Sequence, residues 1–259
     1  MELMKRIILA VPTGQLTAAG AWGRPLAHLC YRVGEGPHLF RAKSPVMPQG
    51  GLMVIDGTGF SGGGEGEAFC NEVLRECAAR KFTGVVCSFP GRPQGALLST
   101  AARLGELCQS RGLECFVSEG CGGAAPTATV IIPTALSGGS LQNRLEEAQN
   151  RYGPDRVAVW VERSAEDFLL PSPTGSGTPL TMEELERRRE EYGSSVFFSS
   201  ELCAHYFTYM AGEQGHFVLF DDAGSIRKKL LMARQLGITT AFLPYGATAE
   251  LLGELLERP

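Results

Sequence analysis

The sequence lacks several features that would assign it to a common functional class. No apolar run approaches the ~20 residues that cross a bilayer, which argues against a membrane-spanning protein. The four histidines are scattered and no cysteines pair as CxxC, so we expect neither a metal site nor a cofactor. A net charge of −4 leaves no basic excess, whereas nucleic-acid binding requires a basic face. These absences exclude three partners at once: membranes, metals and nucleic acid.

Cysteine is present in quantity, with eight residues in 259. Four of them (Cys30, Cys87, Cys115 and Cys203) lie within apolar or aromatic segments, which is typical of reduced, buried cysteine in a cytoplasmic protein. Cys121, in "EGCGG", follows a predicted strand, but no histidine close in sequence could serve as the base of a catalytic thiol.

The N-terminal apolar stretch, Ile7 to Val11, stops at Pro12 and falls short of the ~7–15 residues of a signal-peptide core. We expect a first strand there rather than a signal peptide. The cytoplasm is therefore the predicted location of the chain.

Short apolar runs alternate with helical patterns along the whole chain. Several runs, such as "GLMVID" and "RVAVWV", are continuously apolar, as expected for parallel strands covered on both faces. Predicted strands are 6–11, 26–33, 51–57, 82–89, 113–118, 128–134, 156–162, 195–199, 216–221 and 238–244. Predicted helices, with a period near 3.6, are 65–80, 97–111, 141–152, 182–192, 224–236 and 248–257.

About eight strand–helix units in a chain of this length favour a single (β/α)8 TIM-type barrel domain over residues 1–259. The alternative, a doubly wound sheet, would normally carry a phosphate-binding loop. The segment 57–67, "GTGFSGGGEGE", has no GxGxxG or GxxxxGK[ST] motif, and its acids oppose phosphate binding. We interpret it as a βα loop at the barrel mouth.

Residues 171–215 are predicted to form a small α+β insertion late in the chain. A Pro/Gly/Ser-rich loop leads to a helix capped by Thr181, with Glu184 three residues on. The aromatic segment "HYFTYMAGEQGHFVLF" then predicts an antiparallel hairpin. Its aromatic side chains are expected in the hairpin core, with stacking on sugar as the alternative.

Three stretches carry a family resemblance through their order and spacing. They are "FTGVVCSFPGRPQGALLSTAARLGELCQSRGLECFVSE", "VIIPTALSGGSLQNRLEEAQNRYGPDRVAVWVERSAEDFLL" and the closing "HYFTYMAGEQGHFVLFDDAGSIRKKLLMARQLGITTAFLPYG". Together they resemble the family 18 glycoside hydrolases, the chitinase-like barrels. The similarity spans Gly51 to Gly246 and is greatest for the compact branch of spore-forming bacteria, associated with cell-wall sugar. It implies a glycan containing N-acetylglucosamine as partner, and the sequence leaves open whether the chain is associated with the spore.

The strand within residues 81–93 departs from the family pattern. The family strand ends D-G-x-D-x-D-x-E, and alignment on the glycine puts Thr83, Val86, Ser88 and Pro90 at the acidic positions. The last three alternate, so they are expected on the strand face that points into the barrel.

The resemblance implies a mechanism that this strand does not support. In the family a Glu protonates the glycosidic oxygen while the acetamide of the sugar attacks the anomeric carbon. Val, Ser and Pro offer no proton near neutral pH, and losing a general acid costs ~10²–10⁴-fold in rate. The Tyr-Asp of the family after a later strand is replaced by "PTALSG", and its aromatic floor, usually Trp at the final strand, is reduced to Tyr245.

Carboxylates could instead have moved to other strand ends, where barrel active sites form. Asp56, Glu119 and Glu162 are the candidates, the first two because they would flank the strand that lost its acids. The simpler interpretations are a turn at Asp56 and a surface ion pair of Glu162 with Arg163. The Asp221–Asp222 pair is expected to cap a helix.

These patterns lead to three functional hypotheses. The leading one is a catalytically degenerate member of the fold that binds a glycan at the barrel mouth, with Asp56, Glu119, Glu162 and Tyr245 as candidate binding residues. The second is an active glycosidase with relocated acids. The third is a scaffold protein, which a mouth plugged by Pro90, Pro133 and Pro244 would favour. The sequence gives no oligomeric state.

Overall fold

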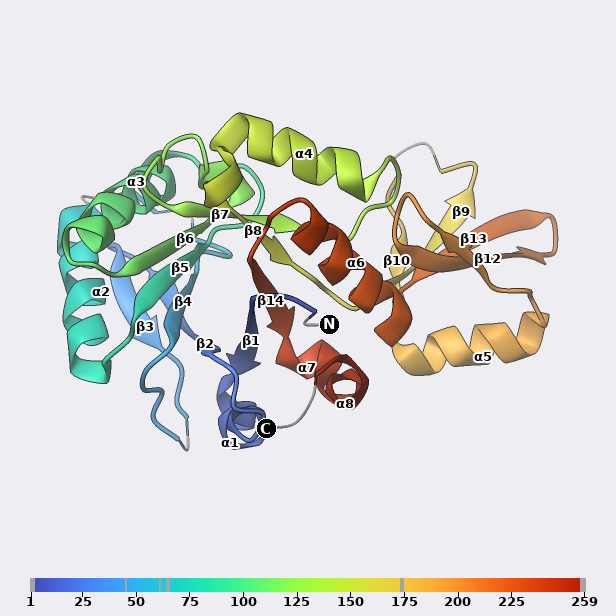
Figure 1. Cartoon of the computed structure of the whole chain (residues 1–259), viewed down its shortest axis with the longest axis horizontal. Helices are drawn as coiled ribbons and strands as arrows, with labels where there is room; N and C mark the ends of the chain where they lie inside the picture. Colours follow the sequence, from blue (N-terminus) through green and yellow to red (C-terminus); the bar gives the residue numbers. More distant parts are fainter. Residues whose placement is uncertain (1–2, 45, 61, 64–65, 173–174, 257–259) are drawn as a thin grey trace.

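Two β-sheets organise the chain, one closed into a barrel and one open (Figure 1). The structure is a computed structural model that describes residues 3–44, 46–60, 62–63, 66–172 and 175–256. Of the predicted mouth loop 57–67, residues 61, 64 and 65 lie outside this description.

The first sheet is a parallel barrel of eight strands, which closes because β1 pairs with both β14 and β2. The order around the barrel is β1 (Arg6–Pro12), β14 (Thr240–Pro244), β8 (Val157–Trp160), β7 (Thr129–Pro133), β6 (Glu114–Ser118), β5 (Gly84–Ser88), β4 (Leu52–Asp56) and β2 (Leu26–Gly34). A short strand, β3 (His38–Arg41), extends the sheet antiparallel to β2. The predicted (β/α)8 barrel is confirmed.

The apolar strands fill the inside of the barrel and also cover its outside. Successive side chains point to opposite faces, so a fully apolar strand supplies both cores. The interior contains ten buried side chains, which are Ile8, Ala10, Ala27, Leu52, Val54, Val86, Phe116, Ile131, Ala158 and Phe242. The alternate residues pack against the helices around the barrel.

Helices surround the barrel, with α2 and α3 on one side and α4 and α6 along another (Figure 1). In α2 the buried residues Phe69, Cys70, Val73, Leu74 and Cys77 recur at helical spacing and form the face that meets the barrel. The α-helices outside the second sheet are α1 (Leu16–Gly20), α2 (Gly66–Arg80), α3 (Gly95–Ser110), α4 (Leu141–Tyr152), α6 (Ala223–Gln235), α7 (Tyr245–Thr248) and α8 (Leu252–Leu255). Short 3-10 turns are η1 (Thr13–Gln15), η2 (Glu119–Cys121), η3 (Pro154–Arg156) and η4 (Ala249–Leu251).

Among the described residues two connections of the barrel carry no α-helix, and the one between β2 and β4 carries the short strand β3 instead. Residues 119–128 link β6 to β7 with only the turn η2, whereas longer helices follow β5 and β7. The outer face of the barrel is therefore covered less deeply between α3 and α4.

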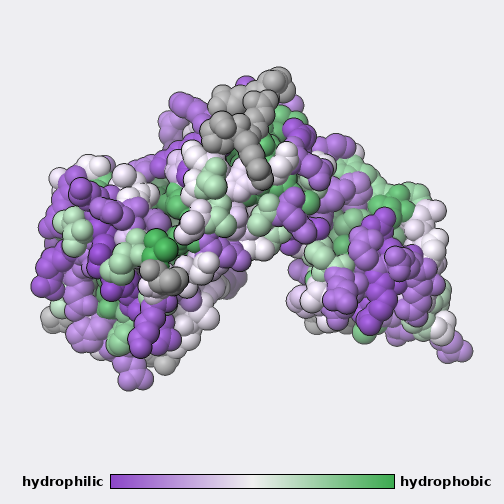
Figure 2. Space-filling view, turned by 90° about the horizontal axis from the view of Figure 1, so that it is seen from below, coloured by the Kyte–Doolittle hydropathy of each residue, from purple (hydrophilic) through white to green (hydrophobic). Residues whose placement is uncertain are grey.

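The second sheet is antiparallel and lies between β8 and α6 in the chain. Its order is β10 (Thr178–Pro179), β9 (Ala165–Leu170), β13 (Gln214–Phe220), β12 (Ala204–Ala211) and β11 (Phe197–Ser199), and α5 (Met182–Tyr192) packs against one face. The predicted hairpin is confirmed by the pairing of β12 with β13, whose Phe207 and Tyr209 are buried. Figure 2 shows the molecule hollowed between this lobe and the barrel.

The insertion is larger than the predicted 171–215, because its sheet starts at Ala165 and ends at Phe220. The prediction began at the Pro/Gly/Ser-rich loop and so missed β9, which follows β8 after only four residues and pairs with β13 along its whole length.

All eight cysteines are buried and unpaired. Burial raises the pKa of the Cys30, Cys70 and Cys77 thiols to about 12. It raises that of Cys121 to about 11, so this thiol is protonated near neutral pH. Among the described helices none is long and apolar enough to span a bilayer.

Candidate binding site at the barrel mouth

The alternation of each strand determines which side chains line the barrel mouth. In each strand the last buried residue that points into the barrel is followed, two positions later, by another inward-facing residue at the C-terminal end. These next residues form a ring of eight around the mouth. The ring consists of Pro12, Leu29, Asp56, Ser88, Ser118, Pro133, Trp160 and Pro244. It contains one carboxylate, one tryptophan and three prolines.

Strand β5 lies in the barrel as the resemblance predicts, beginning at Gly84 beside β6. A Cβ on Gly84 would lie 2.4 Å from the carbonyl oxygen of Glu114, so the position admits only glycine. Val86 is 1% exposed and packs in the barrel interior, Ser88 is half-buried at the mouth, and Pro90 is exposed beyond the strand. No carboxylate extends from this strand.

Asp56 ends β4, next to Ser88 on β5, and is exposed. Its Oδ1 accepts hydrogen bonds from the Thr58 backbone N–H at 2.9 Å and from the Thr58 hydroxyl at 2.6 Å. The predicted turn is therefore present, and it holds the carboxylate at the edge of the mouth.

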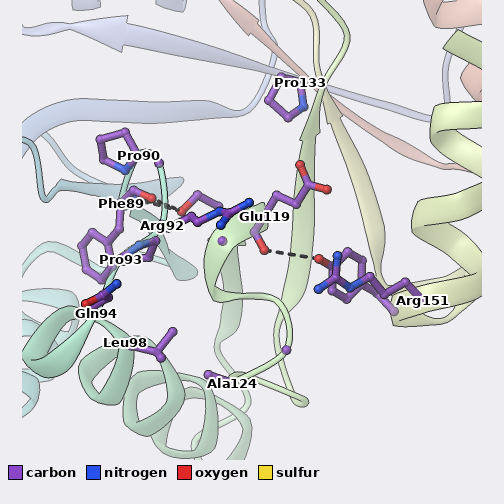
Figure 3. Close-up of a pocket in the computed structure, with 15 residues that line it drawn as sticks. Phe89, Pro90, Arg92, Pro93, Gln94, Leu98, Glu119, Ala124, Pro133 and Arg151 are labelled. Atoms are coloured by element: carbon purple, nitrogen blue, oxygen red, sulfur yellow. Dashed lines mark hydrogen bonds between the residues drawn. The ribbon is translucent and has the colours of Figure 1, made fainter. Parts of the chain in front are cut away.

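Glu119 opens η2 directly after β6, on the other side of β5 from Asp56. Arg144 on α4 donates to both of its carboxylate oxygens, and this ion pair raises the pKa of the Arg144 guanidinium. Figure 3 shows the carboxylate directed toward Pro133, while the Glu119 carbonyl accepts a hydrogen bond from the Tyr152 hydroxyl at 3.4 Å.

Glu162 follows β8 and is exposed. Its Oε1 accepts a hydrogen bond from the indole N–H of Trp160 at 2.7 Å. The ion pair expected between Glu162 and Arg163 is not what the structure shows, because Arg163 pairs with Glu250.

Trp160 is a mouth residue that the sequence interpretation missed. Its half-buried ring stacks on Phe242 of β14, with ring centroids 5.9 Å apart at an interplanar angle of 23°. Phe242 in turn packs edge-on against Phe116 at 5.2 Å. The signal was present in "RVAVW", where the tryptophan lies within the predicted strand 156–162, two residues after the inward-facing Ala158.

Tyr245 lies away from this ring. It begins α7, is 7% exposed, and belongs to the core outside the barrel. With Ala18, Ala21 and Trp22 it lines a separate cavity of about 290 Å³.

The three candidate carboxylates occupy different walls of the mouth. Strands β4 and β8 are four steps apart in either direction around the barrel, so Asp56 and Glu162 start from opposite walls. Eight strands spaced ~4.8 Å apart and tilted ~36° enclose a ring about 15 Å across. Asp56 and Glu162 are therefore not side by side like the carboxylates of a retaining glycosidase, which are ~5–5.5 Å apart.

Structural comparisons place this fold among chitinase-like barrels. The Bacillus cereus spore cortex-lytic enzyme SleL matches with a TM-score of 0.68 and 14% identity over 97% of this chain and 74% of that chain. A chitinase from Chromobacterium violaceum matches with a TM-score of 0.68 and 14% identity over 98% and 100%. Group IV chitinase of Ostrinia furnacalis matches with a TM-score of 0.61 and 12% identity over 92% of each chain. Neither a protein-family model nor a curated protein matches the sequence.

The chain has the chitinase-like (β/α)8 barrel fold that the resemblance to family 18 predicted. At identities of 12–14% the likeness is one of fold, and function is argued from the mouth itself.

Proposed function

We propose that this protein is a catalytically degenerate, family 18-like barrel that binds a glycan containing N-acetylglucosamine at its mouth. The observation that carries the proposal is the end of β5, where Val86 packs inside the barrel and Ser88 and Pro90 follow. None of these side chains can protonate a glycosidic oxygen near neutral pH.

The binding half of the proposal rests on Trp160. Its half-buried ring at the mouth is supported from below by Phe242 and fixed by its hydrogen bond to Glu162. A held indole face is suited to stack on the apolar face of a sugar ring, while Glu162 and Asp56 offer oxygen acceptors to sugar hydroxyls.

The structural neighbours support the ligand class. They include chitinases, one solved in complex with allosamidin, and spore cortex-lytic enzymes. These names favour chitin or cell-wall glycan as the ligand, and association with the spore is part of the same hypothesis. The cytoplasm remains the location predicted from the sequence.

Two other functions have a specific observation in their favour. Glu162 beside Trp160 is a carboxylate at the mouth, as an active glycosidase with relocated acids requires. The mouth ring has less polar surface because it includes Pro12, Pro133 and Pro244. A less polar mouth favours a scaffold protein without a sugar site.

Calorimetric titration with N-acetylglucosamine oligomers and cell-wall disaccharide fragments tests the proposal. We expect saturable binding without turnover. Trp160→Ala should weaken binding about 10-fold, because aromatic stacking contributes ~0.5–1.5 kcal/mol or more. Phe197→Ala is the matched control, since Phe197 is 54% exposed on the edge strand β11 of the second sheet.

The other outcomes identify the other functions. Sustained heat that scales with protein concentration, and that Glu162→Gln, Asp56→Asn or Glu119→Gln abolishes, would establish an active glycosidase. No heat with any oligomer at two temperatures would favour the scaffold.

A further inference from the structure

A second cavity opens on the flank of the barrel and reaches the mouth, where Ser118 and Pro133 of the ring line it. It has a volume of about 830 Å³, within the ~300–1,000 Å³ range of small-molecule sites. Its walls come from the β5–α3 connection, the β6–β7 connection and the end of α4 (Figure 3). We call it the flank cavity, and its principal lining residues are Phe89, Arg92, Leu98, Glu119, Arg151 and Tyr152.

The flank cavity exists because the β6–β7 connection has no α-helix, and two glycines shape that connection. A Cβ on Gly120 would lie 2.5 Å from the Gly91 carbonyl oxygen and 2.7 Å from Pro93. A Cβ on Gly122 would lie 2.7 Å from the Tyr152 ring. The close approach of these segments holds the walls of the cavity in place.

Positive charge in the flank cavity exceeds what its own carboxylate can neutralise. Arg92 and Arg151 line it from two sides, with Glu119 between them in Figure 3. Across the described ranges, no carboxylate lies within the 4.0 Å ion-pair distance of either guanidinium. The Glu119 carboxylate is already paired with Arg144.

The apolar walls lie directly beside these charges. Phe89, Leu98 and Tyr152 contribute carbon surface, and the Arg151 guanidinium sits 5.3 Å from the Tyr152 ring centroid. Gln94, another lining residue, precedes α3 without capping it through its side chain, and the first turn of α3 contains no acid. The partial positive charge of this helix end adds to that of the two arginines.

We infer that the flank cavity binds a small organic anion, namely a carboxylate or phosphate group carried on an apolar body. Guanidinium groups recognise both anions in planar, paired hydrogen bonds, and the apolar walls accommodate the remainder of the ligand. This site adjoins the proposed glycan site and shares Ser118, Pro133 and Glu119 with it, but its two arginines lie outside the mouth ring.

The test titrates the wild-type protein with benzoate, phenyl phosphate and neutral benzamide, followed by amide chemical shifts in NMR spectra. We expect benzoate and phenyl phosphate to saturate and to shift the amides of Gly120 and Arg92, and benzamide to bind far more weakly. Arg92→Gln and Arg151→Gln should each raise Kd about 10-fold, because hydrogen bonds to charged groups contribute ~1.5–3 kcal/mol. Arg111→Gln, an exposed arginine at the far end of α3, should leave Kd unchanged.

If phenyl phosphate binds more tightly than benzoate, the ligand is phosphorylated. If benzoate binds more tightly than phenyl phosphate, the ligand is a carboxylic acid. Equal affinity for benzamide and benzoate would overturn the inference, as would unchanged Kd in both arginine variants or no saturation at millimolar concentrations. The probes contain no sugar, so such a failure leaves the proposed glycan function standing.

Discussion

His28 is a buried histidine, and one of its two ring nitrogens makes a hydrogen bond. It is 3% exposed, its Nε2 lies 3.0 Å from the Gly50 carbonyl oxygen, and its Nδ1 has no hydrogen-bond partner among the residues that the structure describes. Burial lowers the pKa of His28, and the contact with Gly50 opposes that effect only in part. The folded protein therefore favours the neutral ring.

This gives a pH dependence with a defined sign. The unfolded histidine takes up a proton below pH ~6.5, whereas the folded one resists it, so His28 costs stability as pH falls from ~6.5 toward its folded pKa. Urea unfolding of wild type and His28→Gln between pH 7.5 and 5 should show a steeper loss for wild type. Exposed His38, replaced by Gln, is the control. Parallel curves for wild type and His28→Gln would contradict the prediction.

The sequence alone predicts the positions of some side chains and not of others. Val86 and Ser88 were placed on the inward face of a strand by simple alternation, and the interior cluster confirms Val86 there. Trp160 was missed because its importance comes from Phe242, 82 positions away, which alternation within one strand cannot reveal. The partner of Glu119, Arg144, likewise comes from packing between distant segments, whereas Glu162 is paired with Trp160 in the neighbouring sequence.

Helix α5 shows how a local motif determines an element boundary. The Thr181 side chain accepts a hydrogen bond from the Glu184 N–H at 3.1 Å, and the Glu184 carboxylate accepts one from the Thr181 N–H at 2.8 Å. This capping box satisfies two backbone groups that the helix cannot pair internally. Only Leu185 is fully buried along α5, so its start depends strongly on the cap.

Thr181→Ala should lower the free energy of unfolding by about 1 kcal/mol, within the ~0.5–2 kcal/mol measured for helix caps. Urea denaturation followed by circular dichroism measures the change. Arg187→Ala, at an exposed position inside the same helix, is the control and should change stability by less than ~0.5 kcal/mol. Equal effects of the two substitutions would contradict a role for the cap.

Elements with strong periodicity were predictable and short elements were not. The prediction for α4 agrees at both ends, 141–152, because Ser140 caps it and apolar residues recur at helical spacing. Strand β10 has two residues and β3 has four, too few to show a period. The prediction also has no helix between the strands 113–118 and 128–134, as the structure shows for the β6–β7 connection, but the flank cavity became visible only in the structure.

The barrel and the insertion are joined through one buried carboxylate. Asp221 accepts hydrogen bonds from Ser164 at the start of the insertion and from Ser225 in α6. The Lys229 ammonium lies 2.7 Å from both of its oxygens. The side chains of Lys229 and Asp221 are 2% and 0% exposed, so neither charge has water as an alternative partner.

Removing one charge of this pair should destabilise the whole molecule. Lys229→Met leaves a buried, unpaired carboxylate and should cost ~3–5 kcal/mol of unfolding free energy, measured by urea denaturation. The double variant Lys229→Met/Asp221→Asn should recover much of that loss. Lys228→Met is the control, because Lys228 is exposed and its contact with the Phe198 ring is worth ~0.5–1 kcal/mol. Equal losses in the Lys228 and Lys229 variants would refute this account.

The two ends of the insertion also meet in the backbone, where the Asp221 N–H donates to the Ser164 carbonyl at 2.8 Å. The polypeptide thus leaves the barrel and returns to it at a single point. A short engineered turn between these residues would reconnect the barrel without any rearrangement of its strands. Lobes of other sizes could be grafted at the same junction, provided that they replace the packing of Cys203 and Phe198 against the core outside the barrel.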